Sequence, residues 1–418
     1  MKTVRPLRSG FVRPAALLAV LALAAPAIAG ERTYELRYRV AAVPADGVMK
    51  VAVELSGDRK DLPSRLAFSI DPDRHEGFEG DGSVETVDGK LVWEPPSTGG
   101  KLSYRFRVDR ARGHGRYDAR MTDSWAIFRA DHLVPAVASR APKGARSRAE
   151  LVFEMPSGWS VYSGYGPAVR GRIAFDDPDR SLDRPKGWMI VGEIGSRSDE
   201  VAGSEVRVAA PKGSGVRRQD TLAMIAWTLP EIVSVFGKPP PHLLVVIGSD
   251  PFWRGGLSGP ASLFLHADRP LISENRTSTM IHELVHVVSG IHGDAESDWI
   301  AEGLAEYYSV EVLRRTGAIS RKRFDETIAR LGEWGEDAGG VIGPRSSGAV
   351  TARAVTVFAA ADRAIRRATD DRASLDDVAG ALARKSERIG LAELRRVVAE
   401  IAGGPVAEFD RERLGTYR

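Results

Sequence analysis

The sequence contains no cysteine. Disulfide bridges, thiolate metal ligands, a cysteine nucleophile and a lipid-modified cysteine anchor are therefore excluded. Past the first 29 residues there is also no apolar run of the roughly 20 residues that a membrane-spanning helix needs. A chain of 418 residues, 43% of them hydrophobic, can instead be held together by an ordinary hydrophobic core.

The N-terminus has the pattern of a secretory signal peptide. Four basic residues within the first 13 positions precede a short apolar run over residues 15–25, and Ala27-Ile28-Ala29 fits the small-x-small cleavage pattern. We therefore expect residues 1–29 to be a signal peptide cleaved near Ala29, and the mature protein to be periplasmic or secreted. An uncleaved membrane anchor is the alternative.

The excess of positive charge belongs to that segment. Without its four basic residues the chain keeps 55 Lys and Arg against 56 Asp and Glu, a formal net charge of −1. We therefore expect no nucleic-acid binding and no membrane span in the mature chain. The sequence gives no indication of the oligomeric state.

Short alternating segments separated by Gly, Pro and Asp dominate the first third of the mature chain. Period-2 alternation bounded by turn residues predicts strands, and many strands at this spacing predict a β-sandwich, here over residues 30–165. The clearest candidates are Thr33–Val40, Lys50–Leu55, Lys90–Trp93, Leu102–Val108 and Ala149–Phe153. The Gly-, Pro- and Asp-rich residues 164–187 are expected to lead the chain out of this domain.

Strands and helices alternate in the next part, residues 190–325. The predicted strands are Glu205–Ala209, His242–Ile247 and Ala261–Ala267, and the predicted helices are Asp220–Phe236, Thr277–Ser289 and Asp298–Arg315. A further helix is predicted at Arg321–Leu331. After a Gly-rich loop at 332–348, the rest of residues 326–418 has helical periodicity. The sequence therefore predicts an α+β protein with three domains.

His282-Glu283-Leu284-Val285-His286 is the strongest chemical signal in the chain. On a helix, residues four apart lie on the same face, so both imidazoles can bind one zinc ion. Glu283 projects beside them, where it can take a proton from an activated water. A catalytic zinc site of this kind needs a third protein ligand and keeps the fourth position for water.

Two residues compete as the third ligand. His292 follows His286 by six residues, as in metzincins, but a metzincin needs a methionine turn downstream, and all seven methionines lie at or before Met280. Glu302 follows His286 by 16 residues, early in the next predicted helix. We therefore predict one Zn²⁺ on His282, His286 and Glu302. Glu306, one turn further on, is placed to accept a hydrogen bond from a ligand histidine.

These residues resemble the gluzincins, in which HExxH is followed by W-x-x-E-G on the next helix, here Trp299 to Gly303. The likeness is closest to the glycyl aminopeptidase family and more distant to the alanyl aminopeptidases, and it extends to residues 115–133, 255–257 and 352–381. It implies an N-terminal β-sandwich domain, a thermolysin-like zinc catalytic domain and a helical C-terminal domain. It also implies an exported zinc metallopeptidase that hydrolyses peptides or proteins with Glu283 as general base.

The resemblance also suggests where substrate lies. Gly256 and Leu257 precede the strand Ala261–Ala267, which we expect to be the edge strand that pairs with an extended peptide. In the aminopeptidases a glutamate shortly after this element helps to bind the free amine of the substrate. Here Ser258-Gly259-Pro260 follows, without a carboxylate. The choice between exopeptidase and endopeptidase therefore stays open.

A second departure concerns the tyrosine that stabilises the tetrahedral intermediate in those relatives. Thr351 occupies the expected position here. Tyr307, Tyr308, His292 and Arg353 are candidate replacements, and losing such a donor typically costs about 10²–10³ in rate. The alternatives to a peptidase are a catalytically impaired zinc-binding scaffold or peptide-binding protein of the same fold, and a zinc hydrolase for another substrate.

Overall fold

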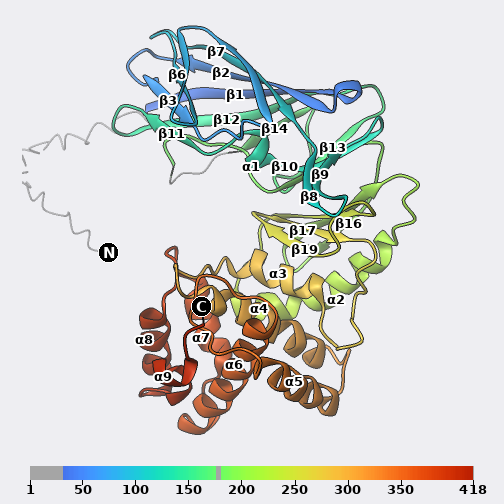
Figure 1. Cartoon of the computed structure of the whole chain (residues 1–418), viewed down its shortest axis with the longest axis vertical. Coiled ribbons are helices and arrows are strands. Elements are labelled where there is room, and N and C mark those ends of the chain that lie inside the picture. Colours follow the sequence, from blue (N-terminus) through green and yellow to red (C-terminus); the bar gives the residue numbers. More distant parts are fainter. Residues whose placement is uncertain (1–31, 176–179, 418) are drawn as a thin grey trace, which may run out of the picture.

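The computed structural model describes residues 32–175 and 180–417. The expected signal peptide at 1–29 lies outside these residues. Across the described ranges, no helix combines the length and the apolar character needed to cross a membrane. The protein has three parts along its long axis: a β region, a smaller sheet in the middle, and a helical region at the opposite end (Figure 1).

The largest sheet of the β region brings the two ends of that region together. Its six strands have the order β14 (Arg172–Phe175), β12 (Ala145–Glu154), β1 (Arg32–Val43), β2 (Val48–Gly57), β7 (Gly100–Arg107) and β4 (His75–Gly80). The predicted strands of this sheet are confirmed. The expectation that residues 164–187 lead the chain out of the domain was wrong at β14, which returns to the sheet and pairs with β12 through Ala149 and Phe175.

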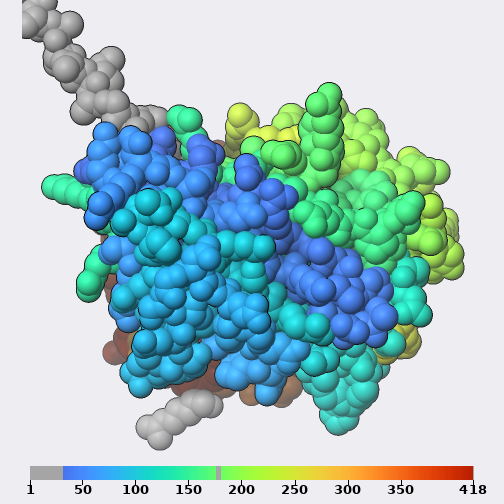
Figure 2. Space-filling view, turned by 90° about the horizontal axis from the view of Figure 1, so that it is seen from above, coloured from blue at the N-terminus to red at the C-terminus, as the bar shows by residue number. Residues whose placement is uncertain are grey.

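Two further sheets complete the β region. One has the order β11 (Val137–Arg140), β3 (Arg65–Phe68), β6 (Lys90–Glu94) and β5 (Ser83–Val87), and the other has the order β13 (Ser160–Ser163), β15 (Trp188–Gly192), β10 (Trp125–Arg129), β9 (Arg116–Met121) and β8 (Arg110–Gly113). The inward side chains of all three sheets form one core around Tyr38, Trp93 and Phe106. Seen from above, this region covers most of the visible face (Figure 2).

The middle sheet is buried on both faces. It has the order β16 (Ile194–Val201), β17 (Ser204–Pro211), β18 (His242–Gly248), β20 (Ser262–His266) and β19 (Gly256–Gly259). Along β18, Leu243, Val245 and Ile247 pack towards the helices. Leu244 and Val246 pack towards the β region. Burial on both sides explains why this strand is a continuous apolar run rather than an alternating one.

The order of strands in this sheet corrects one expectation. The strand predicted at Ala261–Ala267 is β20, but it lies between β18 and β19 and is not the edge strand. The edge strand is β19, formed by Gly256 and Leu257 themselves with the two residues that follow. Gly and Pro around β19 made it too short to recognise as a strand from alternation alone.

The helices cover the opposite face of the middle sheet (Figure 1). They are α2 (Arg218–Phe236), α3 (Thr279–Ser289), α4 (Asp298–Arg315), α5 (Arg321–Gly335), α6 (Ala349–Ala368), α7 (Leu375–Ala383), α8 (Leu391–Ala402) and the short α9 (Arg411–Leu414), whereas the short α1 (Ala130–Leu133) belongs to the β region. The Gly-rich loop begins later than expected, because α5 continues through Gly335. The α+β class with a helical C-terminal part is confirmed.

Candidate metal centre and cleft

Helix α3 presents the two histidines on the face opposite its core contacts. Ser278 caps the helix by accepting a hydrogen bond from the backbone N–H of Ile281 at 3.3 Å, and Gly290 ends it in the left-handed conformation. Ile281 and Leu284 are fully buried against the core. Because they lie on one side of the helix, His282 and His286 face the other side, towards α4.

The structure brings His282, His286 and Glu302 together. The Nε2 atoms of the two histidines are 3.1 Å apart. Each also lies 3.3 Å from a carboxylate oxygen of Glu302. Atoms on a tetrahedron around zinc, with bonds of about 2.0–2.1 Å, are separated by roughly 3.3 Å. The three side chains therefore fit a zinc ion with the fourth position open.

The donor chemistry of His282 also fits a metal. Glu306 Oε2 lies 2.9 Å from His282 Nδ1, and a carboxylate can only accept this hydrogen bond. A proton therefore sits on Nδ1, so Nε2, which faces Glu302 and His286, is the nitrogen that can bind a metal. This arrangement of carboxylate, histidine and metal position is the usual way in which proteins orient a zinc ligand.

The electrostatics of the cluster keep Glu302 ionised. Burial alone would raise the pKa of Glu302, but hydrogen bonds with His282 and His286 outweigh it and hold its pKa well below the ordinary value. Burial likewise acts to lower the pKa of His282, yet Glu302 and Glu306 hold it well above the usual range. The cluster thus carries a surplus of negative charge that attracts a cation.

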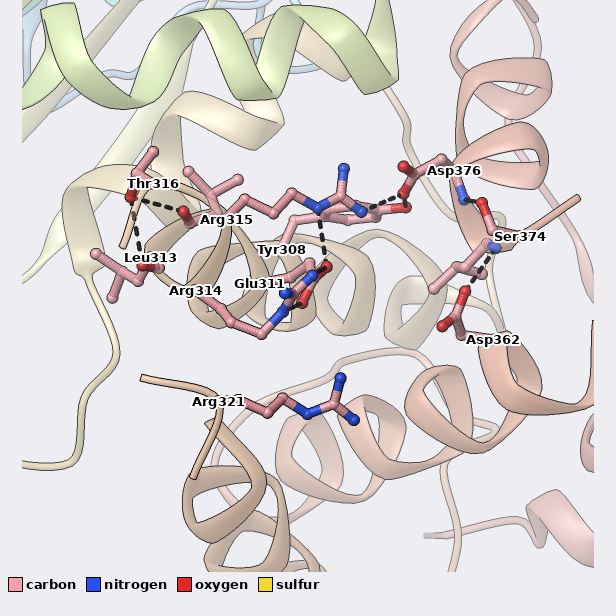
Figure 3. Close-up of polar contacts among 12 residues, drawn as sticks. Tyr308, Glu311, Leu313, Arg314, Arg315, Thr316, Arg321, Asp362, Ser374 and Asp376 are labelled. Carbon is pink, nitrogen blue, oxygen red and sulfur yellow. Dashed lines mark hydrogen bonds and ion pairs between the residues drawn. The ribbon is translucent and has the colours of Figure 1, made fainter. Parts of the chain in front are cut away.

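A buried polar network fixes α4, the helix that carries Glu302 and Glu306 (Figure 3). Arg315 donates to Glu311 and to Asp376 of α7, each at 2.8 Å. The hydroxyl of Tyr308 donates to the same carboxylate of Asp376 at 2.8 Å. Because Glu311 and Tyr308 are buried, these bonds are shielded from water and hold α4 firmly against α7.

Glu283 lies between the metal cluster and the edge strand. It is 7% exposed, and its side chain passes close to Gly256 of β19. A Cβ atom on Gly256 would lie 2.8 Å from Glu283 Cγ and 2.6 Å from Thr279 Cγ2. Only glycine leaves room for the carboxylate here, so Gly256 allows β19 and α3 to approach closely.

A cleft of about 480 Å³ opens over this cluster. Its walls are formed by β19 with the following Pro260, by the turn after α3 at Gly290–Gly293, and by the start of α4. Two arginines outside these segments, Arg129 and Arg388, also line it. Leu257 and His292 both line it. The cleft therefore runs along the edge strand and past the side chains of His282, His286 and Glu302.

Several residues predicted as possible contacts do not reach the cleft. Tyr307 and Tyr308 are buried, and neither lines it. Arg353 donates to the backbone carbonyls of Ala338 and Arg413 instead. The structure therefore does not bring these three side chains to the metal cluster, because their helix faces point into the helical core.

Thr351 and His266 also lie away from the cluster. Thr351 bonds to the hydroxyl of Ser346 at 2.9 Å, behind the cleft wall, and is not among the lining residues. The ring of His266 is buried close to Asp250 and Asp268, and it lines a different pocket from the cleft. Of the candidates proposed to replace the missing tyrosine, only His292 lines the cleft.

Sequence reasoning missed Arg129 and Arg388. Arg129 lies at the end of β10 and donates to the carbonyl of Ser258 on β19 at 3.1 Å. Arg388 lies in the loop between α7 and α8 and donates to the carbonyl of Gly293 at 2.8 Å. Arg129 lies within the segment 115–133 that carries part of the family resemblance, but Arg388 has no motif around it that could have identified it.

Comparisons with known proteins agree with this architecture. No protein-family model and no curated protein sequence matches the chain. Among solved structures, an aminopeptidase N family protein from Idiomarina loihiensis matches with a TM-score of 0.64 and 14% identity, over 83% of this chain and 70% of that one. An M1 zinc metallopeptidase from Deinococcus radiodurans matches with a TM-score of 0.56 and 16% identity, over 90% and 91% of the two chains.

A mutant of the Deinococcus radiodurans enzyme bound to a Tyr-Ser-Ala substrate is also similar, with a TM-score of 0.56 and 15% identity over 93% of this chain and 95% of that one. At such identities the similarity concerns the fold. The order of the sheets and helices and these neighbours together lead to one conclusion: the chain has the fold of the M1 zinc metallopeptidases.

Proposed function

We propose that the chain is an exported zinc-dependent metallopeptidase that hydrolyses peptide bonds in the cleft along β19. The observation that carries the proposal is the convergence of His282, His286 and Glu302 to separations of 3.1 to 3.3 Å beside the buried carboxylate of Glu283. A purely structural zinc site has no use for Glu283. We assign one zinc ion to the three ligands.

Each part of the chain has a task in this proposal. When bound, zinc polarises the scissile carbonyl and lowers the pKa of water towards about 7. Glu283 accepts a proton from the attacking water and passes it to the leaving amine. Glu306 keeps His282 in the tautomer that binds the metal. The edge strand β19 lines the cleft and can offer those of its backbone groups that have no partner within the protein to an extended peptide.

The domain boundaries and the export signal are part of the same proposal. β14 and β15 belong to the sheets of the β region. We therefore propose that the β-sandwich domain predicted at residues 30–165 extends to Gly192, that the catalytic domain predicted at residues 190–325 begins after it, and that the helical domain covers residues 326–418. The β region contributes Arg129 to the cleft and the helical part contributes Arg388. We therefore propose that the cleft needs all three domains. Cleavage of residues 1–29 would release the mature enzyme outside the cytoplasm.

Zinc content and peptide cleavage of the mature chain test this function, with Glu283→Gln as the critical variant. We expect both proteins to bind one zinc. The variant should lose about 10²–10⁴ in rate, the usual contribution of a general base. Glu274→Gln, an exposed residue before α3, is the matched control and should behave as wild type. Mass spectrometry of the products of a mixed peptide library gives the cleavage positions.

Two results would contradict the proposal in different ways. If wild type and variant both bind zinc and neither cleaves, the chain is a zinc-binding scaffold or peptide-binding protein. The absence of tyrosine among the described residues that line the cleft favours this second candidate. If neither protein binds zinc, the assignment of the three ligands is wrong.

A further inference from the structure

The charged side chains that line the cleft differ in whether the protein itself supplies them with a partner of opposite charge. Three carboxylates line it: Glu302 faces the histidines, Glu283 is the proposed base, and Asp298 accepts the backbone N–H of Ser346 at 2.8 Å. Two guanidinium groups also line it, those of Arg129 and Arg388. Their surroundings differ, and this difference shows which of them is free to bind a ligand.

Arg129 is already neutralised. It forms an ion pair with Asp131 at 3.0 Å, and a second nitrogen donates to the carbonyl of Ser258. Asp131 in turn accepts the backbone N–H of Gly187 at 3.2 Å. Arg129 therefore holds β19 against the β region, and its charge is balanced within the protein.

Arg388 is exposed. Among the described residues its side chain makes one hydrogen bond, from Nη1 to the carbonyl of Gly293. Arg388 forms no ion pair with any described residue, so no carboxylate of those residues lies within 4.0 Å of its side-chain nitrogens. The guanidinium has five N–H donors in a planar fork, so at least four of them stay available.

The backbone holds Arg388 at the cleft wall. The N–H of Ile389 donates to the carbonyl of His292 at 2.8 Å, and the N–H of Asp294 donates to the carbonyl of Ile389 at 3.1 Å. These two bonds fix the loop before α8 to the turn after α3. Burial, together with the charge of Arg388, lowers the pKa of the adjacent His292, so this ring is neutral at pH 7.

We propose that Arg388 binds a carboxylate of the substrate, so that the cleft selects peptides with an acidic group near the cleaved bond. This rests on the proposed peptidase function. A guanidinium matches a carboxylate through two parallel hydrogen bonds, whereas a substrate ammonium would be repelled. The carboxylate can belong to an Asp or Glu side chain or to the C-terminus of a short peptide.

The test uses matched peptides. Pairs differ only by Glu or Gln next to the cleaved bond, and each is made with a free and with an amidated C-terminus. The proteins are zinc-loaded wild type, Arg388→Gln, Arg388→Lys, and Arg384→Gln as a control with an exposed arginine outside the cleft. Two ratios of kcat/KM are measured: Glu over Gln at the same C-terminus, and free over amidated C-terminus at the same side chain.

Wild type should prefer the acidic peptide by roughly tenfold, the usual contribution of a hydrogen bond to a charged group, and salt should reduce the preference. Arg388→Gln should bring the ratio close to one, Arg388→Lys should keep part of it, and Arg384→Gln should match wild type. If the free-over-amidated ratio carries the preference, the C-terminal carboxylate is bound; if the Glu-over-Gln ratio carries it, the side chain is bound.

A binding measurement separates failure of this inference from failure of the peptidase function. The same peptides are titrated into Glu283→Gln and into the double variant Glu283→Gln with Arg388→Gln. Tighter binding of acidic peptides that disappears in the double variant supports the inference even if wild type cleaves nothing. Equal binding of acidic and neutral peptides, no binding of either, or a preference that survives Arg388→Gln overturns it, whether or not peptides are cleaved.

Discussion

At the residue scale, Glu306 decides which nitrogen of His282 faces the metal position. Its hydrogen bond to Nδ1 fixes both the tautomer and the orientation of the ring. Without it the ring can rotate and protonate on Nε2, and a protonated nitrogen cannot bind zinc. Loss of Glu306 should therefore lower the affinity for zinc rather than the stability of the fold.

Replacing Glu306 by Ala should weaken zinc binding by about 10–100-fold, the usual effect of losing such a partner. Glu306→Gln keeps an acceptor for the His282 N–H and should lose less. Competition with a chromogenic chelator gives the affinities. Glu333→Ala, on the exposed face of α5, is the control. Unchanged zinc affinity in Glu306→Ala would show that the ring is held by other contacts.

At the element scale, the distance between α4 and α6 depends on Gly303. This residue is the glycine that follows Glu302, and it is buried in the interior of α4. A Cβ atom there would lie 2.6 Å from the Cβ of Ala354 and 2.9 Å from Cε2 of Phe358, both on α6. The glycine thus allows α6 to pack directly against the helix that carries the metal ligand.

Gly303→Ala should therefore destabilise the protein by about 1–3 kcal/mol through overpacking, although alanine is the better helix former by about 1 kcal/mol. Gly332→Ala in α5 is the matched control. Its nearest neighbour is Thr356 Cγ2 at 3.5 Å, an ordinary contact, so it should stabilise by roughly 0.5–1 kcal/mol. Urea midpoints give both values. Stabilisation by both changes would contradict the packing argument.

At the scale of the whole molecule, the β region and the middle sheet share a hydrophobic core. We call it the shared cluster: Ile127, Trp188, Ile190, Ile194, Ala209, Leu244, Val246, Phe252 and Phe264. Trp188 is 1% exposed, and its indole N–H donates to the carbonyl of Leu257 on the edge strand. Neither part can bury these side chains alone, so we expect the two parts to unfold together.

Trp188→Ala should cost about 3–5 kcal/mol, as for a large buried side chain. It should also lower the stability of both parts, because the shared cluster couples them. Hydrogen exchange measured in parallel on β1 and on α3 follows the two parts separately. Trp227→Ala, an exposed residue on α2, is the control and should change little. Loss of protection confined to β1 would show that the parts are independent.

Much of the architecture could be predicted because it depends on local patterns. Periodicity located the long helices and eight of the twenty strands in the described residues. The five-residue motif starting at His282 needs only the pitch of one helix to align its histidines. The edge strand could not be predicted in the same way. Which strand lies at the edge of a sheet depends on pairing between distant segments, and β19 is too short to show an alternating pattern.

The sequence by itself determined the α+β fold and the likeness to the gluzincins, because helix and strand periodicity and short motifs are local properties. It also indicated His282, Glu283, His286 and Glu302 as the site. Only the tertiary structure decided that Tyr308 bonds to Asp376 instead of facing the cleft, and that Arg129 and Arg388 line it. Side chains far apart in the chain meet only through packing, which no local pattern encodes.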